Sequence, residues 1–209
     1  MSNLQQSEDN QDNKFIIKRP TRAEAEAAVR TLIAWAGDNP DREGLIETPK
    51  RVVEAYQEFF SGYEEDPKKI LGKTFEEVEN YNDIVLLKDM SFESHCEHHL
   101  VPIIGVAHIA YIPNQKVVGI SKIARLLKAF AKRLQTQEVM TNQIVDAIVK
   151  HLDPLGVAII IDAKHQCMTT RGVYNATTKT ITKRVTGLFR EDSKLEDRFI
   201  ALVNNKSSY

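Results

Sequence analysis

The apolar positions of this chain follow a helical period at first and a strand period later. Two segments within residues 20–62 carry amphipathic stripes, which are Ala28, Leu32 and Trp35 in the first and Val52, Tyr56, Phe59 and Phe60 in the second. Thr21 and Glu24 can form a capping box before the first stripe. Thr48 followed by Pro49 is a typical helix start before the second. We therefore expect two helices, ending near Gly37 and Gly62.

The period changes in the second part of the chain. DIVLLKDMSFES, VAHIAYIPN, LGVAIIIDAKHQCM and the alternating ATTKTITKRVTG are typical of strands. SKIARLLKAFAKRL, a segment at about 136–151 and the closing EDSKLEDRFIALVNN have helical spacing. The residues expected to face inward on the first two of these helices are Ile123, Leu126, Leu127, Phe130, Leu134, Val139, Ile144, Ala147 and Ile148. Four strands interrupted by a helical pair predict an α+β fold with a mainly antiparallel sheet.

Composition limits the possible classes of protein. With 209 residues and 42% hydrophobic residues, we expect a polar disordered tail at 1–14 and one domain at 15–209, helical up to about residue 80. The net charge of −1 gives no overall basic field for nucleic acid. No apolar run suits a membrane span, and the N-terminus lacks the apolar core of a signal peptide. Two cysteines make no disulfide framework, which favours the cytoplasm.

The stretch SHCEHHLVPIIG concentrates candidate metal ligands. Cys96 and His99 are separated by two residues, so both can reach one ion, and Cys167 is the only other cysteine. Thiolate and imidazole are the ligands that zinc prefers. Three protein ligands would leave one position for a water, whose pKa zinc lowers towards neutrality. The sequence therefore predicts a catalytic rather than a purely structural zinc site.

Other interpretations remain open from the residues alone. The cysteines could be ordinary buried residues or form a disulfide, and a fourth ligand from His95, His98 or His165 would make the zinc structural. Positions two apart in a strand point to the same side, so His165 should face one pocket with Cys167. That histidine, together with His98, would supply groups that exchange protons near neutral pH.

Several separated motifs in one order resemble the GTP cyclohydrolase I family. They are EGLIETPKRV, CEHHLVPIIG, GISKIARL, QEVMTNQI and HQCMTTRG, and the resemblance covers the chain from about residue 20 onward. It implies a T-fold (tunnelling fold) at about 81–209, with an antiparallel four-stranded sheet, helices packed on one side and an N-terminal helical extension. The implied reaction converts GTP and water to 7,8-dihydroneopterin triphosphate and formate, the first step towards folate and pterin cofactors. The implied assembly is a toroidal decamer of two pentamers with active sites between subunits.

The resemblance also implies roles for individual residues. Cys96, His99 and Cys167 would bind Zn²⁺, and His98 and His165 would act as the acid/base pair. Further roles are proton shuttling near Ser121, guanine recognition by Glu138 assisted by Gln137, and triphosphate binding by Lys122, Arg125, Arg171 and Arg51. The chemistry is suitable, because a carboxylate can accept two parallel donors from guanine, and a helix start favours anions.

Two rival functions are weighed against this one. A T-fold relative acting on another purine or pterin is the first; the related nitrile reductase needs a nucleophilic cysteine, whereas here both cysteines are assigned to zinc. The second is a zinc-stabilised oligomeric scaffold without catalysis. It would require a closed metal shell or missing catalytic histidines, and the sequence retains His98 and His165.

Overall fold

The computed structural model of this protein describes residues 18–72, 74–75 and 81–205. The chain divides into two compact units, Met1–Ala55 and Tyr56–Tyr209, and each is described here by itself. The polar tail expected at 1–14 lies outside the described residues.

The first unit contains helix α1 (Arg22–Trp35) and the beginning of α2 (Thr48–Phe59). The predicted capping box is present, because the Thr21 side chain accepts from Glu24 N and the Glu24 carboxylate accepts from Thr21 N at 2.7 Å. Arg22 forms ion pairs with Glu26 and Glu54. The apolar stripe of α1 is not buried, and Trp35 is 86% exposed. Local start signals therefore fixed this helix without a core contact in the described chain.

The second unit is built on a five-stranded sheet of order β5-β2-β3-β6-β7, as far as the chain is described. Its long strands are β2 (Val85–Cys96), β3 (Pro102–Ile112), β6 (Gly156–His165) and β7 (Thr180–Gly187), which pair with one another in antiparallel fashion. The fifth strand, β5 (Leu134–Gln135), pairs in parallel with the end of β2. A separate two-stranded ladder joins β1 (Thr74–Phe75) and β4 (Val117–Val118). The four expected strands are confirmed, and β5 extends their sheet.

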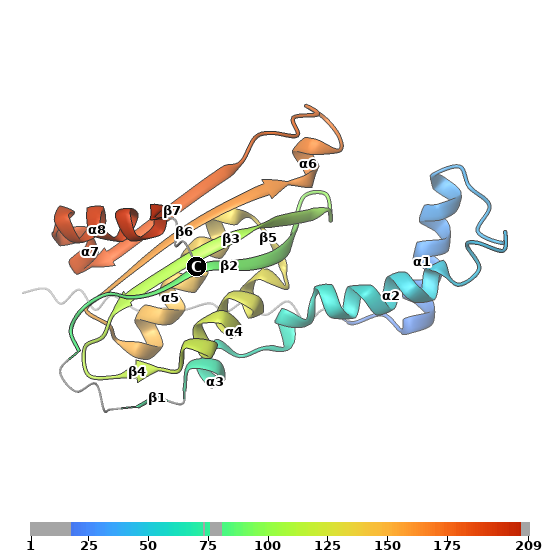
Figure 1. Cartoon of the computed structure of the whole chain (residues 1–209). Coiled ribbons are helices and arrows are strands. Elements are labelled where there is room, and N and C mark those ends of the chain that lie inside the picture. The colour runs from blue at the N-terminus through green and yellow to red at the C-terminus, as the bar shows by residue number, and fades with distance from the viewer. Residues whose placement is uncertain (1–17, 73, 76–80, 206–209) are drawn as a thin grey trace, which may run out of the picture. The chain divides into compact units, whose positions relative to one another are not determined.

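The helices of the second unit lie on both faces of this sheet (Figure 1). Their bounds are η1 (Ser61–Glu64), α3 (Pro67–Leu71), α4 (Ile120–Ala131), α5 (Gln137–Leu152), α6 (Gln166–Thr169), α7 (Leu188–Glu191) and α8 (Ser193–Asn204). The main core joins α4 and α5 to one face, through strand residues such as Ile109 and Ile159. The alternate residues Ala110 and Ala158 pack with Phe189 and Phe199 of α7 and α8 on the other face. Alternation along each strand thus separates two cores.

Three expectations about individual positions are wrong. Leu134 does not end the helix at 121–134, because α4 stops at Ala131 and Leu134 lies in β5. Val139 is exposed on the outer side of α5. The strand carrying His165 ends at that residue, and Cys167 lies on the short helix α6. The two-residue alternation that was expected to align His165 with Cys167 therefore does not apply.

Candidate metal centre and active site

A tight turn between β2 and β3 presents the CEHH stretch at one end of the sheet. Cys96 N donates to Val101 O at 2.9 Å, and Leu100 N donates to Cys96 O at 2.8 Å. The turn places Leu100 at a φ of 56°, in the left-handed region. Cys96 is also paired with Gln135 of β5. The first candidate ligand is therefore fixed by backbone bonds on both sides of its strand.

The fold brings the three candidate ligands Cys96, His99 and Cys167 together, although Cys167 lies 71 residues after Cys96 in the sequence. One ligand atom from each residue lies within 4.8 Å of the others. The Cys96 Sγ atom is 3.9 Å from His99 Nδ1. A tetrahedral zinc ion with bonds of about 2.0–2.3 Å holds its ligands roughly 3.5 Å apart, so the cluster is close to that spacing. Two sulfur atoms and one imidazole nitrogen form a donor set that fits zinc.

The environment of the two thiols is that of a metal-binding pair. Both cysteines are free, Cys96 buried and Cys167 partly buried. Burial, and next the neighbouring Cys96 thiol, raise the pKa of the Cys167 thiol above its usual value. A bound cation reverses this effect, because it deprotonates a coordinating thiol. The pair is therefore suited to hold a cation.

The remaining histidines near the cluster stand apart from the three ligands. His98 is exposed, with Nδ1 3.7 Å from Cys96 Sγ and Nε2 3.6 Å from a Glu97 carboxylate oxygen. His95 is buried and stacks on the ring of Phe59 at 4.7 Å between centroids. Within the described residues, the cluster of potential metal ligands includes none of His95, His98 and His165. The geometry gives no fourth protein ligand from the three histidines considered in the sequence.

His165 is half-buried beside the start of α5. Its Nε2 lies 2.8 Å from Gln137 Oε1. Burial lowers the pKa of His165, and the nearby Glu138 carboxylate opposes that shift. Glu138 itself is exposed in the first turn of α5. A histidine whose pKa is lowered by burial and an accessible carboxylate therefore lie at the same end of the sheet as the cysteines.

Arg171 also reaches this end of the molecule. It follows α6, and its Nη1 donates to His99 Nε2 at 2.9 Å. The guanidinium is exposed, so it is accessible to an anion. The structure thus gathers eight of the predicted residues in one region: Cys96, His98, His99, Gln137, Glu138, His165, Cys167 and Arg171.

Lys122 and Arg125 are not part of this region within a single chain. They lie in the first half of α4, whereas β5, directly after α4, pairs with Cys96. Nine residues of helix separate Lys122 from Ala131, a rise of about 14 Å. Figure 1 shows α4 running from β4 towards β5. Ser121, exposed beside Lys122, lies at the same far end, and the α4 N-cap is Gly119.

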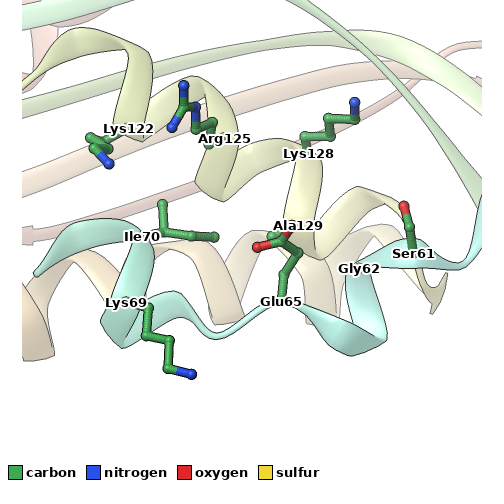
Figure 2. Close-up of a pocket in the computed structure, with 9 residues that line it drawn as sticks. All are labelled: Ser61, Gly62, Glu65, Lys69, Ile70, Lys122, Arg125, Lys128 and Ala129. Atoms are coloured by element: carbon green, nitrogen blue, oxygen red, sulfur yellow. The ribbon is translucent and has the colours of Figure 1, made fainter.

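Lys122 and Arg125 line a basic pocket of about 480 Å³ between α4 and the η1–α3 segment (Figure 2). Lys69 and Lys128 also line it, and Glu65 is its one acidic lining residue. In the part of the chain that the structure describes, none of these four cations forms an ion pair. Sequence reasoning missed Lys69 and Lys128. The signal for Lys128 was present, because it lies three residues after Arg125 on the same helix.

Arg51 lies on the part of α2 that belongs to the first unit, and it is exposed.

Comparison with known proteins identifies the family. The family described as GTP cyclohydrolase I matches residues 25–204. A protein named GTP cyclohydrolase 1 from Maricaulis maris is 63% identical over 185 residues, which are 88% of this chain and 90% of that protein. The chain belongs to the GTP cyclohydrolase I family. Proteins of the same name from Hyphomonas neptunium and Brucella abortus are 60% and 58% identical, over 88% and 90% of this chain and 89% and 88% of theirs.

Membership of the GTP cyclohydrolase I family confirms the predicted relationship and with it the tunnelling fold. The family consists of metal-dependent enzymes, which agrees with a cluster that could bind a metal. Among the described residues, no helix has the length and apolar character needed to cross a membrane.

Proposed function

We propose that this chain converts GTP and water to 7,8-dihydroneopterin triphosphate and formate, the entry step to folate and pterin cofactors. The observation that carries the proposal is the convergence of Cys96, His99 and Cys167 beside histidines outside the ligand cluster. A closed structural site would use four protein ligands, whereas three leave room for reacting molecules. Because the ligands require reduced thiols, we place the enzyme in the cytoplasm.

Zinc is the metal we propose for the cluster, because two thiolates and an imidazole match its preferred donors. When bound, zinc would lower the pKa of a water towards neutrality and so provide the nucleophile for C8 of the guanine. Coordination requires both thiols as thiolates, so metal affinity should decline as pH falls.

The chain's own histidines would move the protons of the reaction. Opening the imidazole ring and releasing formate each require proton transfer to nitrogen or from oxygen, steps suited to a group titrating near neutrality. His98 is exposed beside the ligand cluster and can exchange protons with solvent or with a bound base. His165 contacts Gln137 Oε1 through its Nε2, and burial lowers its pKa.

Glu138 would recognise the guanine. Its carboxylate is exposed in the first turn of α5 and close enough to His165 to influence its pKa. A carboxylate accepts two parallel hydrogen bonds, which match the N1–H and exocyclic amine of guanine. An adenine offers no such pair of donors, so Glu138 would select the base.

The triphosphate would lie against cations from more than one copy of the chain. Arg171 reaches the metal end directly through His99, whereas Lys122 and Arg125 lie at the far end of α4. A second copy can bring its α4 to the metal end of the first, together with Ser121, for the later proton transfers. We propose that a decamer of two pentamers arranges the copies in this way and that Arg51 contributes from a further neighbour.

Metal analysis and turnover measured on the same sample test the proposed function. Zinc-loaded protein given GTP should release formate and a product that becomes a fluorescent pterin after oxidation. Absence of both products from protein with a full complement of zinc would refute the assignment.

The His98→Ala variant separates an enzyme from a scaffold. An enzyme should lose turnover while it keeps zinc and its oligomeric state, because His98 is not part of the ligand cluster. A scaffold should be indifferent in all three measurements.

A further inference from the structure

Gln137 occupies an unusual position beside the proposed acid/base histidine. It is the first residue of α5 and 0% exposed, so a bound substrate cannot reach it in this arrangement. Its Nε2 lies 3.0 Å from Ile161 O and 2.9 Å from Thr180 O. Its Oε1 lies 2.8 Å from His165 Nε2. The side chain thus links two strands of the sheet to a single histidine.

The two backbone carbonyls determine which way the amide of Gln137 faces. Carbonyl oxygens only accept, so the amide nitrogen must face Ile161 and Thr180. A flipped amide would place three acceptors against one another and leave a buried amide nitrogen pointing at the histidine. Burial makes that arrangement costly. The Oε1 atom is therefore committed to His165.

A wider hydrogen-bond network keeps this orientation. The Thr141 hydroxyl donates to Gln137 O at 2.7 Å, so it can only accept from Thr182 Oγ1, also at 2.7 Å. With its own hydrogen used in that way, Thr182 Oγ1 can only accept from Gln137 Nε2, at 3.2 Å, and it shares one of the two amide hydrogens with a backbone carbonyl. Each hydroxyl has a consistent assignment, and none is left without a partner. Every polar atom of this network is therefore assigned a partner within it, apart from Gln137 Oε1, whose partner is His165.

We propose that Gln137 is a positioning residue that holds His165 as the tautomer with hydrogen on Nε2. Because Oε1 can only accept, His165 Nε2 must donate, and the ring's lone pair is then on Nδ1. Gln137 thereby decides which nitrogen can take up a proton in the reaction. This proposal rests on the proposed function of His165, and it replaces the assistance in guanine recognition that the resemblance implied for Gln137.

A positioning residue and a substrate contact have different kinetic effects. Loss of a contact made equally to substrate and transition state raises KM, whereas loss of the correct tautomer lowers kcat. Partners that orient metal-ligating histidines commonly change activity on the order of 10–100-fold, and we expect an effect of similar size for a partner that orients His165. A purely structural glutamine would lower thermal stability without a specific effect on kcat.

The experiment compares three variants of the full-length, zinc-loaded protein with GTP as substrate. Gln137→Met fills a similar space but lacks the amide oxygen that accepts from His165. Gln137→Glu, when protonated, can still accept from His165 and donate to one carbonyl. Thr186→Val is the matched structural control. The Thr186 hydroxyl on β7 accepts from Val157 N of β6, so this side chain also joins the two strands, but it does not contact His165.

We expect Gln137→Met to lower kcat on the order of 10–100-fold, with KM changed less than about threefold. Gln137→Glu should recover part of the loss, and Thr186→Val should lower the melting temperature while kcat stays near that of the parent. An increase in KM alone for Gln137→Met would overturn the proposal in favour of substrate contact. A kcat no lower than that of Thr186→Val would overturn it in favour of a structural role.

The tautomer can be measured without turnover. Nitrogen-15 spectra of histidine-labelled protein at mildly alkaline pH distinguish a protonated from an unprotonated ring nitrogen, and the His165→Gln variant identifies the signal. The parent should show hydrogen on Nε2, and Gln137→Met should show a mixture. An unchanged tautomer in Gln137→Met refutes the proposal. Failure of the parent to turn over GTP would refute the proposed function instead, while these spectra still decide the position of the hydrogen.

Discussion

The metal end and the basic pocket of the second unit differ in how complete they are within one chain. At the metal end, backbone bonds and the register of β2, β3 and β5 bring three ligands within 4.8 Å of one another. In the basic pocket, four cations surround about 480 Å³ of space with Glu65 as the one acidic lining residue. The metal end thus brings its candidate ligands together within one chain, whereas the pocket holds four cations and a single acidic side chain.

This difference bears on the proposal that base recognition and phosphate binding are carried out by different copies of the chain. In the proposed reaction the base of GTP lies at the metal end and its phosphates lie against cations, and about 14 Å of α4 separates Lys122 from the end of the helix that leads to β5. Unpaired cations repel one another unless an anion lies between them. The proposed function places the two regions of one active site on different copies of the chain, and the following predictions test that proposal.

The largest effect is expected from Cys167→Ser at the metal end. Loss of one thiolate should remove zinc. Because zinc would stabilise the transition state by several kcal/mol, GTP turnover should fall on the order of 10³-fold. Zinc content and formate release report the two losses together. Met168→Leu on the same short helix serves as the control and should retain both. Full activity in zinc-free Cys167→Ser would contradict the proposed metal centre.

A smaller effect is expected in the basic pocket. Replacing Arg125 with Gln removes one charge-assisted contact, worth about 1.5–3 kcal/mol, so kcat/KM for GTP should fall roughly 10–100-fold while zinc content is unchanged. Lys150→Gln removes a similar charge from an exposed position in the last turn of α5 and should have little effect. Equal losses in the two variants would mean that general charge, not the pocket, matters.

Mixing two defective proteins tests whether the regions act across copies. Cys167→Ser lacks the metal end, and a Lys122→Gln/Arg125→Gln double variant lacks the basic one. If sites combine regions from different copies, random co-assembly should restore about one quarter of the sites. Activity is measured before and after the two are unfolded and refolded together, with each variant refolded alone as the control. No gain on co-assembly would place the whole site within one chain.

The smallest effect concerns His108, which lies away from both regions. Burial lowers the pKa of His108, with a further contribution from Lys88, while Asp89 and Asp162 oppose it. The unfolded chain then binds the proton more readily than the folded one, so stability is full above pH of about 6.5 and declines below it. His108 Nδ1 accepts from Asp89 N at 3.1 Å, a bond that protonation would break.

His108→Asn keeps an acceptor at this position without a titrating ring. Its melting temperature should fall less than that of the parent between neutral and mildly acidic pH, by about 2–4 °C per kcal/mol of difference. Both proteins are compared at equal zinc and protein concentrations. Parallel curves for the two would show that His108 does not contribute to the pH dependence.

The elements were largely predictable from the sequence where local signals were strong. The capping box at Thr21 and the apolar stripe of α4 lie where the pattern predicted them. The errors lie at the ends of elements, where Leu134 joins β5 through pairing with β2 and where β6 gives way to α6. Strand pairing and the turn after His165 depend on distant residues, which a local period does not contain.

The sequence by itself predicted the family and the order of helices and strands, because motifs and apolar periods depend on residue type and spacing. Through the family resemblance it also predicted Cys96, His99 and Cys167 as the candidate metal ligands. Only the tertiary structure decided that Gln137 is buried against His165 and that Lys122 lies far from the cysteines. Both outcomes follow from strand register and helix direction. These bring residues together or separate them irrespective of their distance along the chain.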